Sequence, residues 1–141
     1  MEELIILSLH VLANTWIDGF IITNAGCDDI NNGAGIQSFG DDADFNVVNT
    51  IFLELCAADG GAIFCPSFPK ILNTAFLGNT AGFYGGAIYA RNQCDFICHW
   101  CTFDSNSASK INGAVYLTYD SDVYFESTNF RDNYVKCFFF L

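Results

Sequence analysis

The sequence predicts an all-β fold, a single-stranded parallel β-helix (solenoid) of about four coils of 24–27 residues. An aromatic residue is followed three positions later by Asn, a Gly-rich turn comes next, and apolar and polar residues alternate before the aromatic. The repeated pairs are Phe76 with Asn79, Phe103 with Asn106, and Phe130 with Asn133. From Phe52 onward the aromatic recurs after 24, 27 and 27 residues, a period that indicates units stacked on one another.

Each coil is expected to begin with a short strand, a corner and a second short strand. Five positions before the repeated aromatics stand Val47, Ile71, Cys98 and Phe125, and two positions before them stand Thr50, Thr74, Cys101 and Thr128. Apolar or small residues alternate with polar ones at period two, with one shift of phase before the aromatic. Asn49 and Asn73 stand just before this shift, where a tight bend in the left-handed region is expected.

The Asn of the repeat begins another corner, and glycines then lead the chain into a third strand. These glycines are Gly60, Gly61, Gly85, Gly86 and Gly113, and the strands after them open with Ile63, Ile88 and Val115. Glycine permits positive φ or close contact between coils. Three strands and three corners per coil are therefore predicted, with Asn79, Asn106 and Asn133 stacked at one corner.

We expect one domain over residues 1–141, with coils over 15–135, a ragged start over 1–14 and a truncated end over 136–141. The apolar stretch from Leu4 to Ala13 suits a strand or a signal-like segment, although acidic residues stand where a signal peptide carries Lys or Arg. No polar cap is evident at the end. The sequence therefore predicts an uncapped piece of a longer solenoid that self-associates through its ends.

The composition restricts the partners. Hydrophobic residues make up 52% of the chain and charged residues 15%, so core material is plentiful. The net charge of −11 repels phosphate backbones and anionic membrane surfaces, which disfavours nucleic acid as a partner. No apolar run approaches the ~18 residues that span a bilayer.

The Phe-x-x-Asn and Gly-Gly-Ala-Ile phrases resemble the repeat of polymorphic outer-membrane-protein-like sequences. Ile17 to Ile22 resembles the coil-opening phrase of secreted right-handed β-helix proteins of the pectin-lyase-like class. The resemblance covers about residues 10–135. It implies a right-handed β-helix in an exported, extracellular or cell-surface protein, adhesin-like, serving as a rigid structural or adhesive scaffold.

The expected partners are glycans or cell-surface proteins of a host or neighbouring cell. The alternative is a fragment of a carbohydrate-active enzyme, a polysaccharide lyase or glycoside hydrolase, whose active coils lie elsewhere. Such a site needs carboxylates, usually with Lys or Arg, on one outward face. The five basic residues do not recur at a common position, so we assign no catalytic residue and lean against an enzyme.

The cysteines offer competing hypotheses. Cys94, Cys98 and Cys101 have the spacing of an iron–sulfur site, and His99 makes zinc an alternative. The repeat instead explains Cys98 and Cys101 as small inward residues, so no cofactor is expected. Cys27 and Cys56 follow equivalent corners of successive coils, which places them close enough for a disulfide or for two stacked thiols.

Asp95 and Asp122 occupy the same position one coil apart. Like charges at ladder spacing repel unless they are solvated or bridged, so the pair is a candidate Ca²⁺ site, with solvated loop carboxylates as the alternative. Six tyrosines are candidate outward aromatics for glycan or protein contact: Tyr84, Tyr89, Tyr116, Tyr119, Tyr124 and Tyr134.

Overall fold

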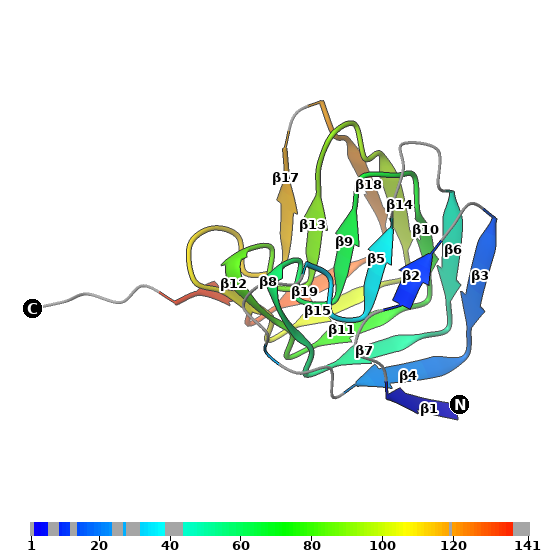
Figure 1. The fold of residues 1–141 in the computed structure, drawn as a ribbon, viewed down its shortest axis with the longest axis horizontal. Helices are drawn as coiled ribbons and strands as arrows, with labels where there is room; N and C mark the ends of the chain where they lie inside the picture. Colours follow the sequence, from blue (N-terminus) through cyan, green and yellow to red (C-terminus); the bar gives the residue numbers. More distant parts are fainter. Residues whose placement is uncertain are drawn as a thin grey trace, which may run out of the picture.

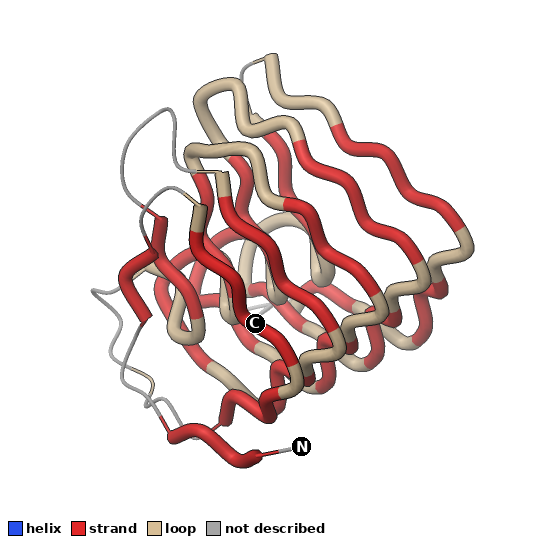
Figure 2. The backbone as a smooth tube through the Cα atoms, turned by 90° about the vertical axis from the view of Figure 1, so that its right-hand side faces the viewer, coloured by secondary structure: helices blue, strands red, loops and turns tan. Residues whose placement is uncertain are grey.

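The computed structural model describes residues 2–5, 9–11, 14–23, 27, 32–38, 44–118 and 120–136. Its strands form four sheets in which every pairing is parallel, and the described residues contain no helix (Figure 1). The chain winds through the four sheets in turn and then begins the next coil beside the last, so coils stack like rungs (Figure 2). The predicted parallel β-solenoid is confirmed.

We number the sheets in the order in which one coil passes through them. The first sheet contains β3 (Thr15–Asp18), β6 (Phe45–Val48), β10 (Lys70–Leu72), β14 (Phe96–His99) and β18 (Val123–Glu126). The second contains β1 (Glu2–Ile5), β4 (Phe20–Thr23), β7 (Ile51–Leu53), β11 (Ala75–Leu77), β15 (Thr102–Asp104) and β19 (Asn129–Arg131). The third contains β8 (Cys56–Asp59), β12 (Thr80–Tyr84), β16 (Ser107–Ala108) and β20 (Tyr134–Val135). The fourth contains β2 (Leu9–Val11), β5 (Ile36–Ser38), β9 (Ile63–Cys65), β13 (Ile88–Ala90) and β17 (Val115–Leu117).

The expectation of three strands per coil was wrong, because the third sheet lies between the Asn corner and the Gly turn. The inward position of its first three strands is Ala57, Ala81 and Ala108, and Ala is depleted in strands, so the sequence gives no strong strand signal there. The pairing of β12 with β8 also shifts register between Ala81 and Tyr84, which breaks the period-two alternation.

The register follows the repeat. Phe52, Phe76, Phe103 and Phe130 pair in succession through β7, β11, β15 and β19. Their rings stack with centroid distances of 5.0, 4.6 and 4.7 Å and nearly parallel planes. The first three rings are fully buried, whereas Phe130 in the last described coil is 49% exposed. This stack forms the centre of the core over the second sheet.

The first corner of each coil uses a residue with positive φ. Asn49 and Asn73 have φ of 50° and 46°, as the sequence predicted, and Trp100 and Ser127 have φ of 53° and 49° at the same position. Asn73 Nδ2 donates to Asn49 Oδ1 at 2.8 Å, so neighbouring corners are linked through their side chains.

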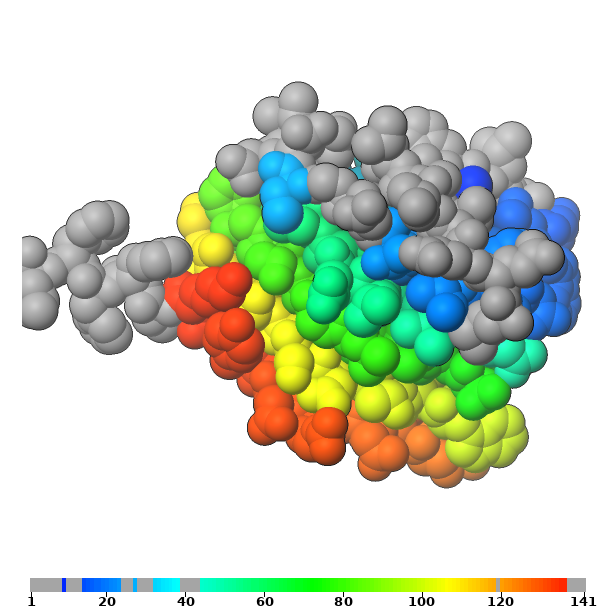
Figure 3. Space-filling view, turned by 90° about the horizontal axis from the view of Figure 1, so that it is seen from below, coloured from blue at the N-terminus to red at the C-terminus, as the bar shows by residue number. Residues whose placement is uncertain are grey.

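The successive coils are visible on the outside as adjacent bands, from cyan through green and yellow to orange (Figure 3). No helix long and apolar enough to cross a bilayer occurs within the described ranges.

Candidate functional site

An open groove of about 510 Å³ lies along the first sheet. The outer face of this sheet contributes one side chain from each of three successive coils to the lining of the groove. Lys70 pairs with Ile97, and Ile97 with Tyr124, so these three side chains form one column. Their neighbours Ile71 and Cys98 are buried on the opposite face, as period-two alternation requires. The full lining is Phe68, Pro69, Lys70, Asp95, Phe96, Ile97, Asp122, Val123 and Tyr124.

Aromatic side chains beside the groove are unusually exposed. Tyr124 is 59% and Phe68 is 38% exposed, and Trp100 at the first corner reaches 62%. The His99 ring lies 5.9 Å from both the Trp100 and the Tyr124 rings, which makes the surface continuous from groove to corner. His99 Nδ1 lies 3.0 Å from Glu126 Oε2, and this contact fixes the imidazole on the outer face. We call Phe68, Ile97, His99, Trp100 and Tyr124 the aromatic face.

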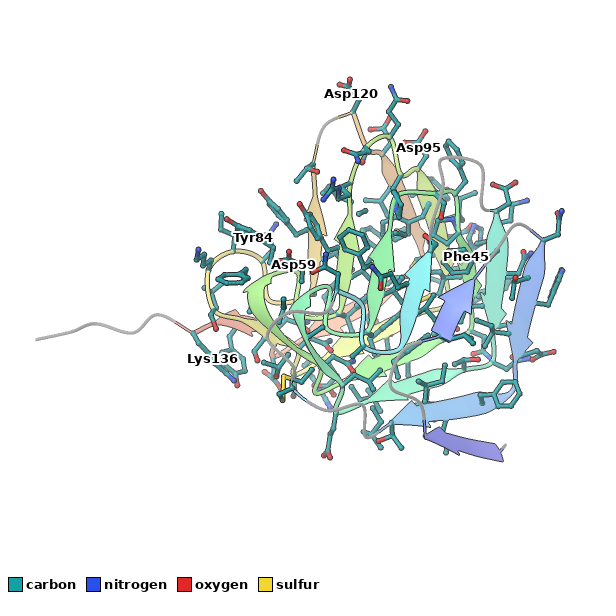
Figure 4. All side chains as sticks on the ribbon, in the orientation of Figure 1. Phe45, Asp59, Tyr84, Asp95, Asp120 and Lys136 are labelled. Carbon is teal, nitrogen blue, oxygen red and sulfur yellow. A yellow bond between two sulfur atoms is a disulfide. The ribbon has the colours of Figure 1, made fainter. Side chains whose placement is uncertain are left out.

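Asp95 and Asp122 lie at the groove, in the loops that precede β14 and β18. Figure 4 labels Asp95 in the first of these loops. The Asp122 backbone N–H donates to Asp95 Oδ1 at 2.8 Å, so this carboxylate links two coils. No group of three or more His, Cys, Asp or Glu side chains is arranged to hold a metal ion in the described part of the chain. Ca²⁺ takes six to eight oxygen ligands, and two carboxylates supply only part of that set. The Ca²⁺ site stays a prediction.

The repeated asparagines form a hydrogen-bonded ladder at the corner after the second sheet. Asn79 Nδ2 donates to Asn106 Oδ1, and Asn106 Nδ2 to Asn133 Oδ1, each at 2.9 Å. Each amide also donates to the carbonyl of the repeated aromatic in the coil before, as Asn106 does to Phe76 O at 3.0 Å. The ladder ends where Leu55 occupies the position, and its N–H donates to Asn79 Oδ1 at 3.1 Å.

The turn glycines are placed where coils touch. Gly60 and Gly85 adopt positive φ of 59° and 62°. A Cβ on Gly61 would overlap the carbonyl oxygen of Gly86, and a Cβ on Gly86 would overlap that of Gly113. A Cβ on Gly113 would in turn overlap the backbone of Tyr134. Only glycine therefore allows this spacing of the coils.

Several of these features fall within a segment that matches a known family model. Residues 73–91 match the Chlamydia polymorphic membrane protein (Chlamydia_PMP) repeat. The matched segment contains Phe76, Asn79 and the Gly85–Gly86 turn. The match spans 19 of the 141 residues and shows a likeness to this repeat. No curated protein and no solved structure matches the chain.

The cysteines separate into different environments. Cys27 and Cys56 form a disulfide that joins successive coils, with Cα atoms 4.7 Å apart. Cys98 and Cys101 are buried and inward, whereas His99 between them points outward to Glu126. Burial and the neighbouring Cys101 raise the pKa of the Cys98 thiol, which keeps it protonated. This arrangement separates His99 from the thiols that a zinc site would need.

A second aromatic cluster, which sequence reasoning missed, fills the angle between the third and fourth sheets. Tyr84 stacks on Tyr116 at 5.0 Å, and Tyr116 on Tyr89 at 5.4 Å. Lys110 Nζ lies 4.5 Å from the Phe83 ring centroid. Tyr84 lies in β12, a strand of the third sheet, which the sequence did not predict. Its contact with Tyr116 of the fourth sheet could therefore not be predicted from the sequence.

Asp59 lies close to this cluster (Figure 4). Burial raises the pKa of the Asp59 carboxyl, although the Tyr84 N–H, Arg91 and Lys110 act to lower it. Of the predicted outward tyrosines, Tyr84, Tyr89 and Tyr116 thus pack together, Tyr124 and Tyr134 are exposed, and Tyr119 lies outside the described residues.

Proposed function

We propose that this chain is a rigid scaffold segment of an exported surface protein, and that the aromatic face with its groove binds neutral glycans on another cell. The observation that carries the proposal is the contiguous set of exposed side chains of the aromatic face beside the carboxylates of Asp95 and Asp122. Single exposed aromatics are ordinary, but a contiguous set on one face marks a contact site.

The chemistry of the groove favours sugars. An exposed ring such as Tyr124 offers a flat apolar surface to the C–H groups of a pyranose and a hydroxyl at its edge. Asp95 and Asp122 provide acceptors for sugar hydroxyls, and such charge-assisted hydrogen bonds are strong. The net charge of −11 disfavours sulfated or acidic glycans, so neutral chains are the favoured class.

The scaffold holds these groups without a large ordering cost. Lys70, Ile97 and Tyr124 project from β10, β14 and β18 of one continuous sheet. The first two strands are paired on both sides, and β18 is paired on one side. Binding groups on strands keep their spacing better than groups on loops, and preorganisation improves affinity.

The test is binding of the purified chain to an array of neutral glycans and to cells treated with glycosidase. Tyr124→Ala should weaken binding about tenfold or more, since exposed aromatic anchors dominate contact energies. Tyr134→Ala is the matched control, because Tyr134 is 50% exposed on the third sheet, and its binding should stay unchanged. Binding that survives glycosidase and Tyr124→Ala, or that follows basic proteins instead, would refute the glycan proposal.

One observation favours a second candidate, an enzyme acting on polysaccharide. Lys70, Asp95 and Asp122 line the same groove, and acid–base chemistry needs groups that both take and release a proton. If the groove is catalytic, incubation with neutral polysaccharides should yield shorter chains, and Lys70→Ala should abolish the release. Intact polymer after prolonged incubation with folded protein would remove this candidate.

A further inference from the structure

In two strands of the fourth sheet, β5 and β9, the last residue is buried and its side chain meets a loop residue of the next coil. In one coil this pair is Ser38 and Ser67, whose Oγ atoms lie 2.8 Å apart. In the next coil it is Cys65 and Cys94, whose Sγ atoms lie 2.6 Å apart. The serine and the cysteine pairs are each 29 residues apart, and β5 and β9 run in register up to the residue before Ser38 and Cys65.

The Sγ atoms of Cys65 and Cys94 are in direct contact with each other. Both are fully buried, so water does not solvate either thiol. The separation of the sulfurs is closer to the S–S bond of about 2.05 Å than to a contact of non-bonded sulfur atoms. Cys101, by contrast, directs its thiol to the carbonyls of Ile71 and His99 at 3.6 and 3.4 Å.

We propose that Cys65 and Cys94 form a disulfide in the mature protein. Together with Cys27–Cys56, the bond ties three successive coils into one covalent unit. A solenoid frays coil by coil from its ends, because each repeat contacts only its neighbours. Covalent links between neighbouring coils oppose this fraying, which suits a protein exposed to proteases and to dilution outside the cell.

The bond forms by exchange with the disulfide of a thiol–disulfide oxidoreductase or of a small-molecule disulfide. One thiolate attacks the oxidant and forms a mixed disulfide, and the second thiolate then displaces the oxidant's remaining sulfur. The two cysteine protons are released, and the two electrons reduce the oxidant to a dithiol or to two thiols. Burial raises the pKa of Cys65, so the exchange takes place before this coil closes.

In the cell the bond requires the oxidising compartment that the proposed surface location provides. The experiment tests the disulfide independently of the surface location, because the oxidant is supplied in vitro by refolding the protein with a glutathione redox couple. The full chain is denatured without reductant, alkylated, and cut with trypsin and an Asp-specific protease. Cleavage at Asp59 separates Cys56 from Cys65, and cleavage at Asp95 separates Cys94 from Cys98.

We expect a cross-linked peptide pair containing Cys65 and Cys94, which reductant splits into its two parts. Alkylated Cys65 and Cys94, or a link from either to Cys98 or Cys101, would overturn the proposal. This result is read on the unmodified chain and does not depend on any variant folding.

The double variant Cys65→Ser, Cys94→Ser provides the matched comparison, because it copies the Ser38–Ser67 pair of the preceding coil. Without reductant its half-life under protease should fall several-fold below that of the unmodified chain, and in reductant the two should converge. Cys98→Ser should keep the cross-linked peptide. Equal half-lives of the unmodified chain and the double variant in both conditions would show that the bond is absent.

Discussion

At the residue scale, Asn79, Asn106 and Asn133 satisfy backbone groups where the chain turns and strand pairing stops. Asn106 Oδ1 accepts hydrogen bonds from the N–H and the Nδ2 of Asn79, at 3.0 and 2.9 Å. Asn79 and Asn106 are fully buried, so water cannot replace these bonds. A side chain that both donates and accepts is required at each rung, which explains why the repeat returns to Asn.

Asn106→Ala should lower the free energy of unfolding by about 1–3 kcal/mol, because it leaves buried groups of Asn79 and the Phe76 carbonyl unpaired. Asn133→Ala should cost clearly less, since Asn133 lies in the half-exposed last described coil. Chemical denaturation of the two variants measures the difference. Equal losses would show that the ladder does not carry the energy assigned to it.

Gly86 and Gly82 offer a matched pair of substitutions in neighbouring positions. A Cβ at Gly86 would meet Ser107 backbone atoms at 2.5 and 2.6 Å, whereas the nearest atom to a Cβ at Gly82 lies 3.5 Å away. Gly86→Ala should destabilise by about 3 kcal/mol through overpacking, and Gly82→Ala should be close to neutral. Thermal melts followed by circular dichroism compare them, and a stable Gly86→Ala protein would mean that the coils are spaced differently.

Asp59 gives stability a specific pH dependence. Because burial raises its pKa above the ordinary 3.8, the folded state binds its proton more tightly than the unfolded state. Its favourable contribution is therefore fully present below pH 3.8 and is lost as the pH rises through the raised value. Asp59→Asn should be more stable than the unmodified chain at pH 7, with a gap that closes on acidification. A pH-independent gap in parallel melts would contradict this account.

At the element scale, the strands are too short to be stable alone, and they are stabilised by pairing with the strands of neighbouring coils. Most contain three or four residues, and each inner strand pairs with a neighbour on both sides. The central phenylalanine of the second sheet adds ring contact to this pairing in every coil from Phe52 to Phe130.

Phe76→Ala should cost about 3–5 kcal/mol, because it removes a fully buried ring between two stacked neighbours. Phe130→Ala should cost about 1–2 kcal/mol, since half of its ring is already exposed. Denaturant midpoints of the two variants test the gradient along the stack. If Phe130→Ala proves as costly as Phe76→Ala, the last described coil is covered by something further.

At the scale of the whole molecule, the last described coil exposes core side chains. A hollow of about 470 Å³ opens there, lined by Asn112, Ala114, Val115, Leu117, Val123, Phe125 and Phe130. Unpaired strand edges and apolar surface favour association with another chain.

We therefore expect the purified chain to self-associate as its concentration rises, as measured by sedimentation velocity. Phe130→Glu should shift the protein towards monomer, because it places a charge in the hollow. Trp16→Glu is the control, since Trp16 is 67% exposed but lies on the first sheet in an early coil. A monomer at all concentrations, or an equal effect of the two variants, would count against association through this end.

The sequence by itself determined the solenoid, its period and the register of its coils. Phe76, Asn79 and Gly86 each have an equivalent residue at the same position of the next coil. Residues at equivalent positions stack on one another and therefore share one environment. The positive-φ corners at Asn49 and Asn73 and the proximity of Cys27 and Cys56 followed from the same register. Repetition makes such contacts legible, because the sequence offset between neighbours is nearly constant.

The tertiary structure alone decided what happens between sheets that the repeat does not align. The third sheet was hidden by its small residues, so the stacking of Tyr84 on Tyr116 across a corner could not be read from the offsets. The pairing of Cys65 with Cys94 and the joining of Phe68 to Tyr124 in one groove depend on how loops return to the sheets. The repeat period determines which equivalent residues stack. Contacts between residues at non-equivalent positions depend on the geometry of the corners, and that geometry arises only when the coil closes.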